Sequence, residues 1–365
     1  MVAGLVAGIG RSPAVLASAC LVAAAVLAVT ATRVQGRWTY EWIGLVTRYS
    51  VRRRRWSAAP GPDPAILTAV SPGARIGQIE PDARAGRLDA DAEEPIGVVT
   101  HEAGLTAVLA IEPTTDRSVP LPAPLALLPM AEAGESPITA QALVEVVPAP
   151  LGTLAGTSVE QSYRGLHGRP PPARRHGWIA LQAVRVPDRS DSDVQELGTA
   201  LTSALRRTRR RLTKAGLATR VLDRNELADT IDELGSDQPD AEYGAAPSGA
   251  MAEEWAHWRT PSSAQATLSV VGWPDLSDPV AASAFDRLPD AAGVPTVLAL
   301  GVRRADRGVE VQAVIRLTAA TRADVDRAVA SVRASAASAG LRLRRLDGEQ
   351  VHGLAATLPL GVFLR

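Results

Sequence analysis

The chain of 365 residues is long enough for two or three ordinary domains, and its 39 basic side chains balance its 39 acidic ones. Its single cysteine, Cys20, excludes an intramolecular disulfide and a zinc site built from cysteines. The sequence contains no P-loop, HExxH or GxSxG motif, so P-loop ATPases, zincins and hydrolases with a nucleophile elbow lack their defining residues here.

The charges are distributed unevenly along the chain. Residues 1–56 contain eight arginines and one acidic residue, Glu41, which gives this segment a charge of +7. The remainder, with 31 basic and 38 acidic side chains, carries −7. A nucleic-acid-binding protein would place its basic surface on the folded domain. We therefore expect no nucleic-acid partner and a basic segment that lies next to a membrane.

An uncharged apolar stretch runs from Ser12 to Thr32, between Arg11 and Arg33. Its 21 residues, at a rise of 1.5 Å each, span about 30 Å, the thickness of the hydrocarbon core of a bilayer. A signal peptide has a shorter apolar region that follows a basic start. We predict a membrane anchor over residues 1–35, with the following chain in the cytoplasm, because seven arginines follow the span closely and one precedes it.

Residues 36–59 are predicted to form a juxtamembrane amphipathic basic helix. Apolar and aromatic side chains fall on one helical face, and four consecutive arginines follow. The face consists of Trp38, Trp42, Leu45, Val46 and Tyr49. Aromatic rings favour the lipid headgroup level, and arginines attract anionic lipid. The segment is either an ordinary flank of the anchor or a docking surface for a partner's membrane region; the candidate interface residues are Arg37, Trp38, Trp42, Tyr49, Arg52, Arg53, Arg54 and Arg55.

Residues 60–95, rich in proline and then in charge, predict a linker, and residues 96–365 predict a cytoplasmic α/β domain. The first two strands of this domain are expected to form a hairpin with a turn that ends at Gly104. Alternating strands and helices imply an α/β body with substantially parallel pairing. Strands are expected at 96–100, 105–111, 142–147, 178–186, 217–222, 266–272, 296–302 and 310–317, and helices at 193–212, 226–234 and 322–339.

The body contains an internal sequence echo. Residues Ala215–Leu217 and Leu222–Asp223 recur 124 residues later as Ala339–Leu341 and Leu346–Asp347. Each copy follows a predicted strand and a long helix, so the echo indicates two β-α-β-α units with an insertion between them. Chance similarity in a chain rich in alanine, arginine and leucine is the alternative.

Two charged clusters are candidates for function. Asp188, Asp191 and Asp193 resemble an acidic loop that holds a divalent cation, although acids at this place also suit the start of a helix. Further along, Arg206, Arg207 and Arg210 lie on the outer side of a helix, either as a solvated face or as a contact for an acidic partner or the inner leaflet. The histidines are isolated, so no catalytic residue, metal ligand or cofactor is assigned.

Two segments resemble the EccE family, the E component of the type VII secretion membrane complex. They are Arg33–Trp42 with the arginines 52–55 behind it, and Tyr163-Arg164 leading through Arg174-Arg175 to Trp178. Members usually carry two membrane spans, whereas one is legible here. The resemblance implies a non-catalytic structural subunit of a plasma-membrane secretion channel, assembled with EccB, EccC and EccD, of which EccC is the motor ATPase. The competing hypothesis is a membrane-anchored, glycosyltransferase-like enzyme that uses Asp191 and Asp193 on a divalent metal.

Overall fold

The computed structural model divides the chain into an N-terminal unit, residues 1–53, and a body, residues 54–365. The two units are described separately. The described residues are 17–18, 20–24, 32–34, 37–57, 61–80, 95–112, 128, 136–148, 173–185, 193–236, 249–275, 285, 287–305 and 308–364.

Among the described residues of the N-terminal unit, 17–18 and 20–24 are helical, and a short hairpin farther along leads into a longer helix. Strand β1 (Arg33–Val34) pairs antiparallel with β2 (Arg37–Trp38), and α3 (Thr39–Val51) follows at once. The Glu41 carboxylate accepts a hydrogen bond of 3.0 Å from the Trp38 backbone N–H, which helps to begin the helix. Most of the apolar stretch 12–32 lies outside the described residues. Within the described part of the chain, no helix has both the length and the apolar character that a membrane crossing requires.

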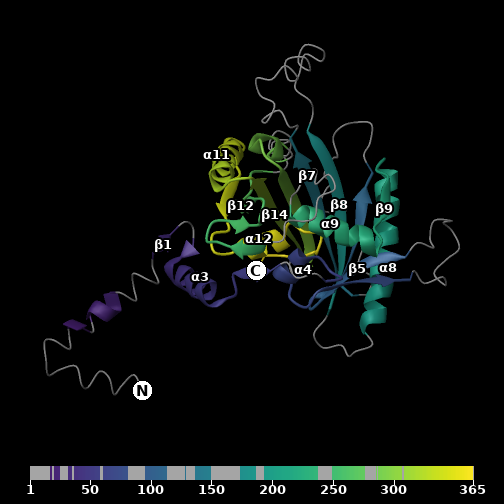
Figure 1. Ribbon diagram of the computed structural model, residues 1–365, viewed down its shortest axis with the longest axis horizontal. Helices are drawn as coiled ribbons and strands as arrows, with labels where there is room; N and C mark the ends of the chain where they lie inside the picture. The colour runs from purple at the N-terminus through teal and green to yellow at the C-terminus, as the bar shows by residue number, and fades with distance from the viewer. Residues whose placement is uncertain are drawn as a thin grey trace, which may run out of the picture. The chain divides into compact units, whose positions relative to one another are not determined.

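The described strands of the body form one 13-stranded sheet (Figure 1). Its main path runs β3-β10-β11-β12-β14-β13-β7-β8-β6-β5-β4; β15 adds to β12 and β9 adds to β6. The strands are β3 (Arg55–Ser57), β4 (Arg75–Ile79), β5 (Ile96–His101), β6 (Gly104–Ile111), β7 (Ile138–Val147), β8 (Arg174–Val184), β9 (Thr219–Val221), β10 (Ala250–Glu253), β11 (Trp258–Arg259), β12 (Ala264–Gly272), β13 (Thr296–Ala305), β14 (Gly308–Ala319) and β15 (Arg342–Arg345). The predicted hairpin before and after Gly104 is confirmed as β5 and β6.

The α/β class is confirmed, but the predicted parallel pairing is wrong: every pairing between described strands of the body is antiparallel. The reason lies in the crossovers. β8 leads through a long helix to β9, and both strands run antiparallel to β6. β8 and β9 therefore have the same direction, but β6 lies between them. The alternation of strand and helix in the sequence does not reveal such an inserted strand.

Two segments of the body share one connectivity. Repeat 1 (residues 104–236) contains β6, β7, β8, α8 (Asp193–Lys214), β9 and α9 (Arg224–Ser236), and repeat 2 (residues 264–355) contains β12, β13, β14, α11 (Arg322–Ser338), β15 and α12 (Gln350–Ala355). In both repeats the first strand pairs with the third and the fourth, and the second strand pairs with the third. β7 and β13, the second strands of the two repeats, pair antiparallel at the junction. This shared connectivity favours duplication over chance similarity.

The sequence echo marks equivalent hydrogen bonds in the two repeats. Each long helix ends at a glycine with positive φ, +83° at Gly216 and +74° at Gly340. The next residue, a leucine, donates to the helix five residues back, from Leu217 to Leu212 and from Leu341 to Ala336, at 2.9 Å each. Farther on, the Leu222 N–H bonds to β6 and the Leu346 N–H bonds to β12.

The helices cover both faces of the sheet. Ala142 and Leu300 are paired directly across β7 and β13, and they belong to the cores under α8 and α11 respectively. These two helices therefore share one face of the sheet. On the other face, α4 (Ala65–Val70), α9 and α12 share a third core, which includes the fully buried Leu67. Residues 61–80 of the predicted linker thus form α4 and β4 and belong to the body.

Local signals explain where two of the helices begin. The Asp223 carboxylate accepts from the N–H groups of Asn225 and Glu226, at 2.7 and 2.9 Å, and the Glu226 carboxylate accepts from the Asp223 N–H at 3.1 Å. This reciprocal arrangement is a capping box for α9. The Thr321 hydroxyl accepts from the Asp324 N–H at 3.2 Å and caps α11.

Candidate interaction surfaces

The side chains on the predicted aromatic face of α3 are partly buried. Leu45 is buried, and Trp38, Trp42 and Tyr49 are half-buried. The guanidinium carbon of Arg33 lies 4.1 Å from the centre of the Trp38 ring, and that of Arg52 lies 5.7 Å from the Tyr49 ring. Both distances suit cation–π contacts. The structure therefore brings the predicted aromatic residues together with arginines, and Arg37 beside them is half-buried.

A second apolar face of α3 is more exposed. Tyr40 and Ile43 are each 52% exposed, Val46 is 43% exposed and Val51 is 82% exposed. Val46 was predicted to share the face of the tryptophans, and the other three were not among the predicted interface residues. Tyr40, Ile43 and Val51 follow one another at helical spacings of three and eight residues, which a search for a second stripe would find.

The predicted helix over 36–59 ends earlier than expected. Helix α3 stops at Val51, and residues 55–57 instead form β3, which pairs with β10 of the body. The rings of Trp56 and Trp258 lie 5.1 Å apart, and Trp258 is fully buried. The arginine cluster is consequently divided: Arg52 and Arg53 belong to the N-terminal unit, and the exposed Arg54 and Arg55 belong to the body.

Helix α8 has the predicted apolar inner side and a basic outer side. Leu197, Leu201, Leu205 and Leu212 are buried, whereas Val194 is 54% exposed. The outer side is strongly basic near the end of the helix. Arg206 and Arg207 are half-buried, Arg210, Arg211 and Lys214 are exposed, and Arg211 donates to the Leu128 carbonyl at 2.9 Å.

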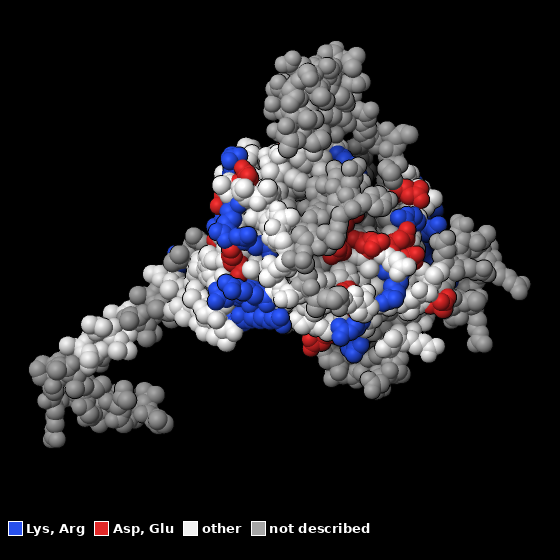
Figure 2. All heavy atoms as spheres, in the orientation of Figure 1, with Lys and Arg blue, Asp and Glu red and all other residues white. Residues whose placement is uncertain are grey.

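Helix α9 exposes carboxylates that the sequence analysis did not single out. Asp229, Asp232 and Glu233 lie on its outer side, and Figure 2 shows acidic side chains gathered over this helix. Partial burial, and then the neighbouring Asp229, raise the pKa of the Asp232 carboxyl. Asp232 and Glu233 follow Asp229 by three and four residues, a spacing that places acids side by side on a helix, so the sequence could have predicted this acidic surface.

The acidic loop predicted as a possible metal site lies largely outside the residues that the structure describes. Asp188 and Asp191 lie outside the described residues; Asp193 begins α8, and its side chain also lies outside them. Among the residues that are described, no three His, Cys, Asp or Glu side chains are grouped so as to hold a metal ion.

The described histidines make contacts within the body. The Gln182 side-chain nitrogen lies 2.7 Å from His101 Nε2, and burial lowers the pKa of His101, an effect that a hydrogen bond to the Leu360 carbonyl partly offsets. His257 lies 3.1 Å from the Asp326 carboxylate. His176 lies 3.5 Å from the buried Glu145 carboxylate.

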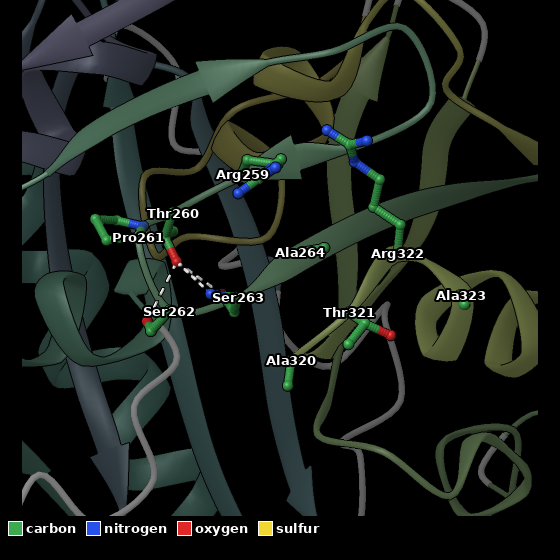
Figure 3. A pocket seen from close by; sticks show the side chains of 10 residues that line it. All are labelled: Arg259, Thr260, Pro261, Ser262, Ser263, Ala264, Ala320, Thr321, Arg322 and Ala323. Carbon is green, nitrogen blue, oxygen red and sulfur yellow. Dashed lines mark hydrogen bonds between the residues drawn. The ribbon is translucent and has the colours of Figure 1, made fainter.

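A hollow of about 410 Å³ lies between the β11–β12 turn and the start of α11 (Figure 3). Its polar groups bond within the protein. Arg259 and Arg322 both pair with Glu254, the Thr260 hydroxyl lies 2.8 Å from that of Ser263, and Thr321 caps α11. These bonds account for its polar lining as part of the packing of the turn against the helix.

The matched family model is described as "EccE: Putative type VII ESX secretion system translocon, EccE", and it covers residues 172–270, from the start of β8 into β12. The resemblance to the EccE family is confirmed. No curated protein matches the chain. A solved structure titled "alkyldihydroxyacetonephosphate synthase in P1" is similar at 10% identity and a TM-score of 0.27; the match covers 67% of this chain and 41% of that one, and this EccE-like chain thus spans well under half of that length. A likeness at this TM-score carries no argument.

Proposed function

We propose that the chain is a non-catalytic structural subunit of a bacterial type VII, ESX-like protein secretion channel in the plasma membrane. The family match over residues 172–270 carries this proposal, because the matching family is described as a component of that translocon. The matched segment contains the basic helix α8 and the acidic helix α9, so the most strongly charged helices of the body lie within it.

The partners proposed are the other core subunits, EccB, EccC and EccD, together with the lipid bilayer. The N-terminal unit supports this assignment, since α3 exposes apolar side chains on a segment rich in arginine. Apolar and aromatic groups next to arginines suit a membrane surface or the flanks of a partner's membrane helices. We place the anchor at residues 1–35, within this unit and before α3, and the body in the cytoplasm, following the arginine asymmetry of the sequence.

Co-purification tests the assembly directly. Tagged full-length chain is recovered from detergent-solubilised membranes, and EccB, EccC and EccD are quantified per copy of the chain. Trp38→Ala with Trp42→Ala is expected to lower this recovery on the order of tenfold, because removing a tryptophan at the centre of an interface can cost about 2 kcal/mol or more. The paired change Val309→Ala with Val311→Ala is the control, since both valines are exposed apolar side chains on the body. Undiminished recovery with the tryptophan pair would remove α3 from the interface, and no core subunits with the wild-type chain would refute the proposed function.

The proposed orientation has its own test. Single cysteines at Ser57 or Ser236, in a chain with Cys20→Ala, should resist a membrane-impermeant thiol reagent in intact cells and react after lysis. Reaction in intact cells would place the body on the outer side of the membrane.

A further inference from the structure

The two helices of repeat 1 carry opposite charge. From Arg206 to Lys214, α8 contains six basic side chains and no acidic one. Helix α9 contains four acidic side chains and one basic residue, Arg224. The sheet separates them, since α8 packs with the core on one face and α9 packs with the core on the other. One copy of the body therefore presents a basic helix on one face and an acidic helix on the opposite face.

Repeat 2 shows that the fold itself does not need this separation of charge. Helix α11, which occupies the place of α8, contains three arginines and two aspartates. Helix α12, which occupies the place of α9, contains no aspartate, glutamate, lysine or arginine. The same connectivity thus forms with helices of mixed charge or none. The charges of α8 and α9 call for an explanation outside the packing of the repeat.

The two charged surfaces are complementary in spacing as well as sign. Arg210 and Lys214 are exposed and lie one helical turn apart, as do Asp229 and Glu233. Side chains at this spacing stand beside one another on a helix surface. Arginine pairs well with carboxylates, and a row of cations on one helix can meet a row of anions on another.

We propose that the basic face of α8 binds the acidic face of α9 on a second copy of this chain. The contact joins two different surfaces, so each copy that binds through α8 still offers α9 to another copy. Contacts of this head-to-tail kind close into a ring or continue as a filament, according to the rotation between copies. Because the pairs lie at the surface, salt weakens the contact.

This inference does not depend on the proposed function, because it concerns the purified chain alone. Self-association is measured on full-length protein in detergent by sedimentation velocity at low and at high salt. Failure of self-association would leave the secretion assignment untouched, and loss of co-purifying subunits would leave self-association untouched.

Charge exchange gives the sharpest test. Arg210→Glu with Lys214→Glu places acids at the two proposed contact positions of α8, and Asp229→Arg with Glu233→Arg places arginines at the two proposed contact positions of α9. Each variant alone is expected to self-associate more than about tenfold more weakly than wild type, because like charges then face one another. A one-to-one mixture of the two variants should recover association, since the glutamates introduced on α8 of one variant can pair with the arginines introduced on α9 of the other. Recovery also demonstrates that both variants are folded.

The matched control is Arg327→Glu with Arg333→Glu on α11, which reverses two exposed charges at the equivalent helix of repeat 2. It should leave self-association unchanged. Three outcomes would overturn the proposal: wild-type chain that stays a single copy at low salt, variants that associate as wild type does, or a mixture that fails to recover. A variant pair that changes only binding to vesicles of anionic lipid would assign α8 to the membrane instead.

Discussion

The two repeats have the same strand and helix connectivity, but they differ in what their helices bury and expose. Helix α8 buries four leucines and exposes cations, whereas α11 buries valines and alanines and exposes charges of both signs. Connectivity follows from apolar faces, caps and turns, which both repeats retain. The charges of the outer side chains can differ because the shared connectivity does not depend on them, so we assign intermolecular contacts to the repeat that has become strongly charged.

The repeats also differ on the face of the sheet that α4, α9 and α12 cover. Repeat 2 buries Arg316, whose guanidinium donates to Thr357, Gln265 and the Leu234 carbonyl near the end of α9. The carbonyl end of a helix carries partial negative charge, which suits a buried cation. At the corresponding place repeat 1 has Ala180, because Val108 of β6 pairs with Ala180 as Thr267 of β12 pairs with Arg316. The neutral Gln182 lies two residues farther along β8, next to His101. A single residue of repeat 2 thus joins the last turn of repeat 1 to the C-terminal segment.

The largest effect is expected for Arg316→Ala. Its removal leaves buried acceptors unsatisfied and a cavity behind, which should lower the free energy of unfolding by about 3 kcal/mol. Gln182→Ala, two residues from the matching position on the same strand of repeat 1, removes a smaller neutral group and should cost about 1 kcal/mol. Urea denaturation of both variants measures the difference. Equal losses would show that the buried guanidinium has no special part in joining the repeats.

A smaller effect tests the equivalence of the two helix ends. Gly216→Ala should cost about 1 kcal/mol, because a side chain is strained at positive φ even though nothing lies within 4 Å of the added carbon. Gly340→Ala should cost more, since the added carbon would lie 3.3 Å from Cβ of Pro274. Thermal or urea denaturation decides the order. If Gly216→Ala were neutral, the shared helix-end geometry would not account for the sequence echo.

The smallest effect is a pH dependence that involves His101, which lies in β5 and contacts Gln182 of repeat 1. Burial lowers the pKa of His101, so the unfolded chain takes up a proton there at a higher pH than the folded chain does. The stability that His101 contributes is therefore present above its ordinary pKa near 6.5 and is lost as the pH falls below it. His101→Gln should flatten this part of the pH profile of urea midpoints. A guanidinium does not titrate in this range, so Arg316→Ala should leave the profile's slope unchanged.

Local features of the fold were predictable from the sequence. The long helices, the hairpin at Gly104 and the repeated Ala-Gly-Leu helix ends depend on caps, glycines and apolar spacing within a few residues. The antiparallel order was not predictable, because the position of β6 between β8 and β9 depends on pairing between distant segments. Helix α4 was taken for part of a linker, since its six residues are too few to show a period and their burial comes from α9 and α12.

The candidate surfaces were predictable only in part. The basic side of α8 was legible from its run of arginines, but which of them are exposed depends on neighbouring segments. On α3, the tryptophans fitted an apolar stripe, yet Tyr40 and Ile43 are the more exposed side chains. Tryptophan and tyrosine are partly polar, and periodicity does not show whether their rings meet arginines or solvent. The sequence did not show that the acidic side of α9 and the basic side of α8 lie on opposite faces of the sheet, which the structure shows.

The most direct test of the account compares the two long helices in the assembled complex. Tagged full-length chains with Arg210→Glu and Lys214→Glu on α8, or with Arg327→Glu and Arg333→Glu on α11, are purified from detergent-solubilised membranes, and the number of copies of the chain per recovered secretion complex is measured. The account predicts fewer copies with the α8 variant and the wild-type number with the α11 variant. Equal numbers with both variants would contradict the claim that repeat 1 carries the contacts between molecules.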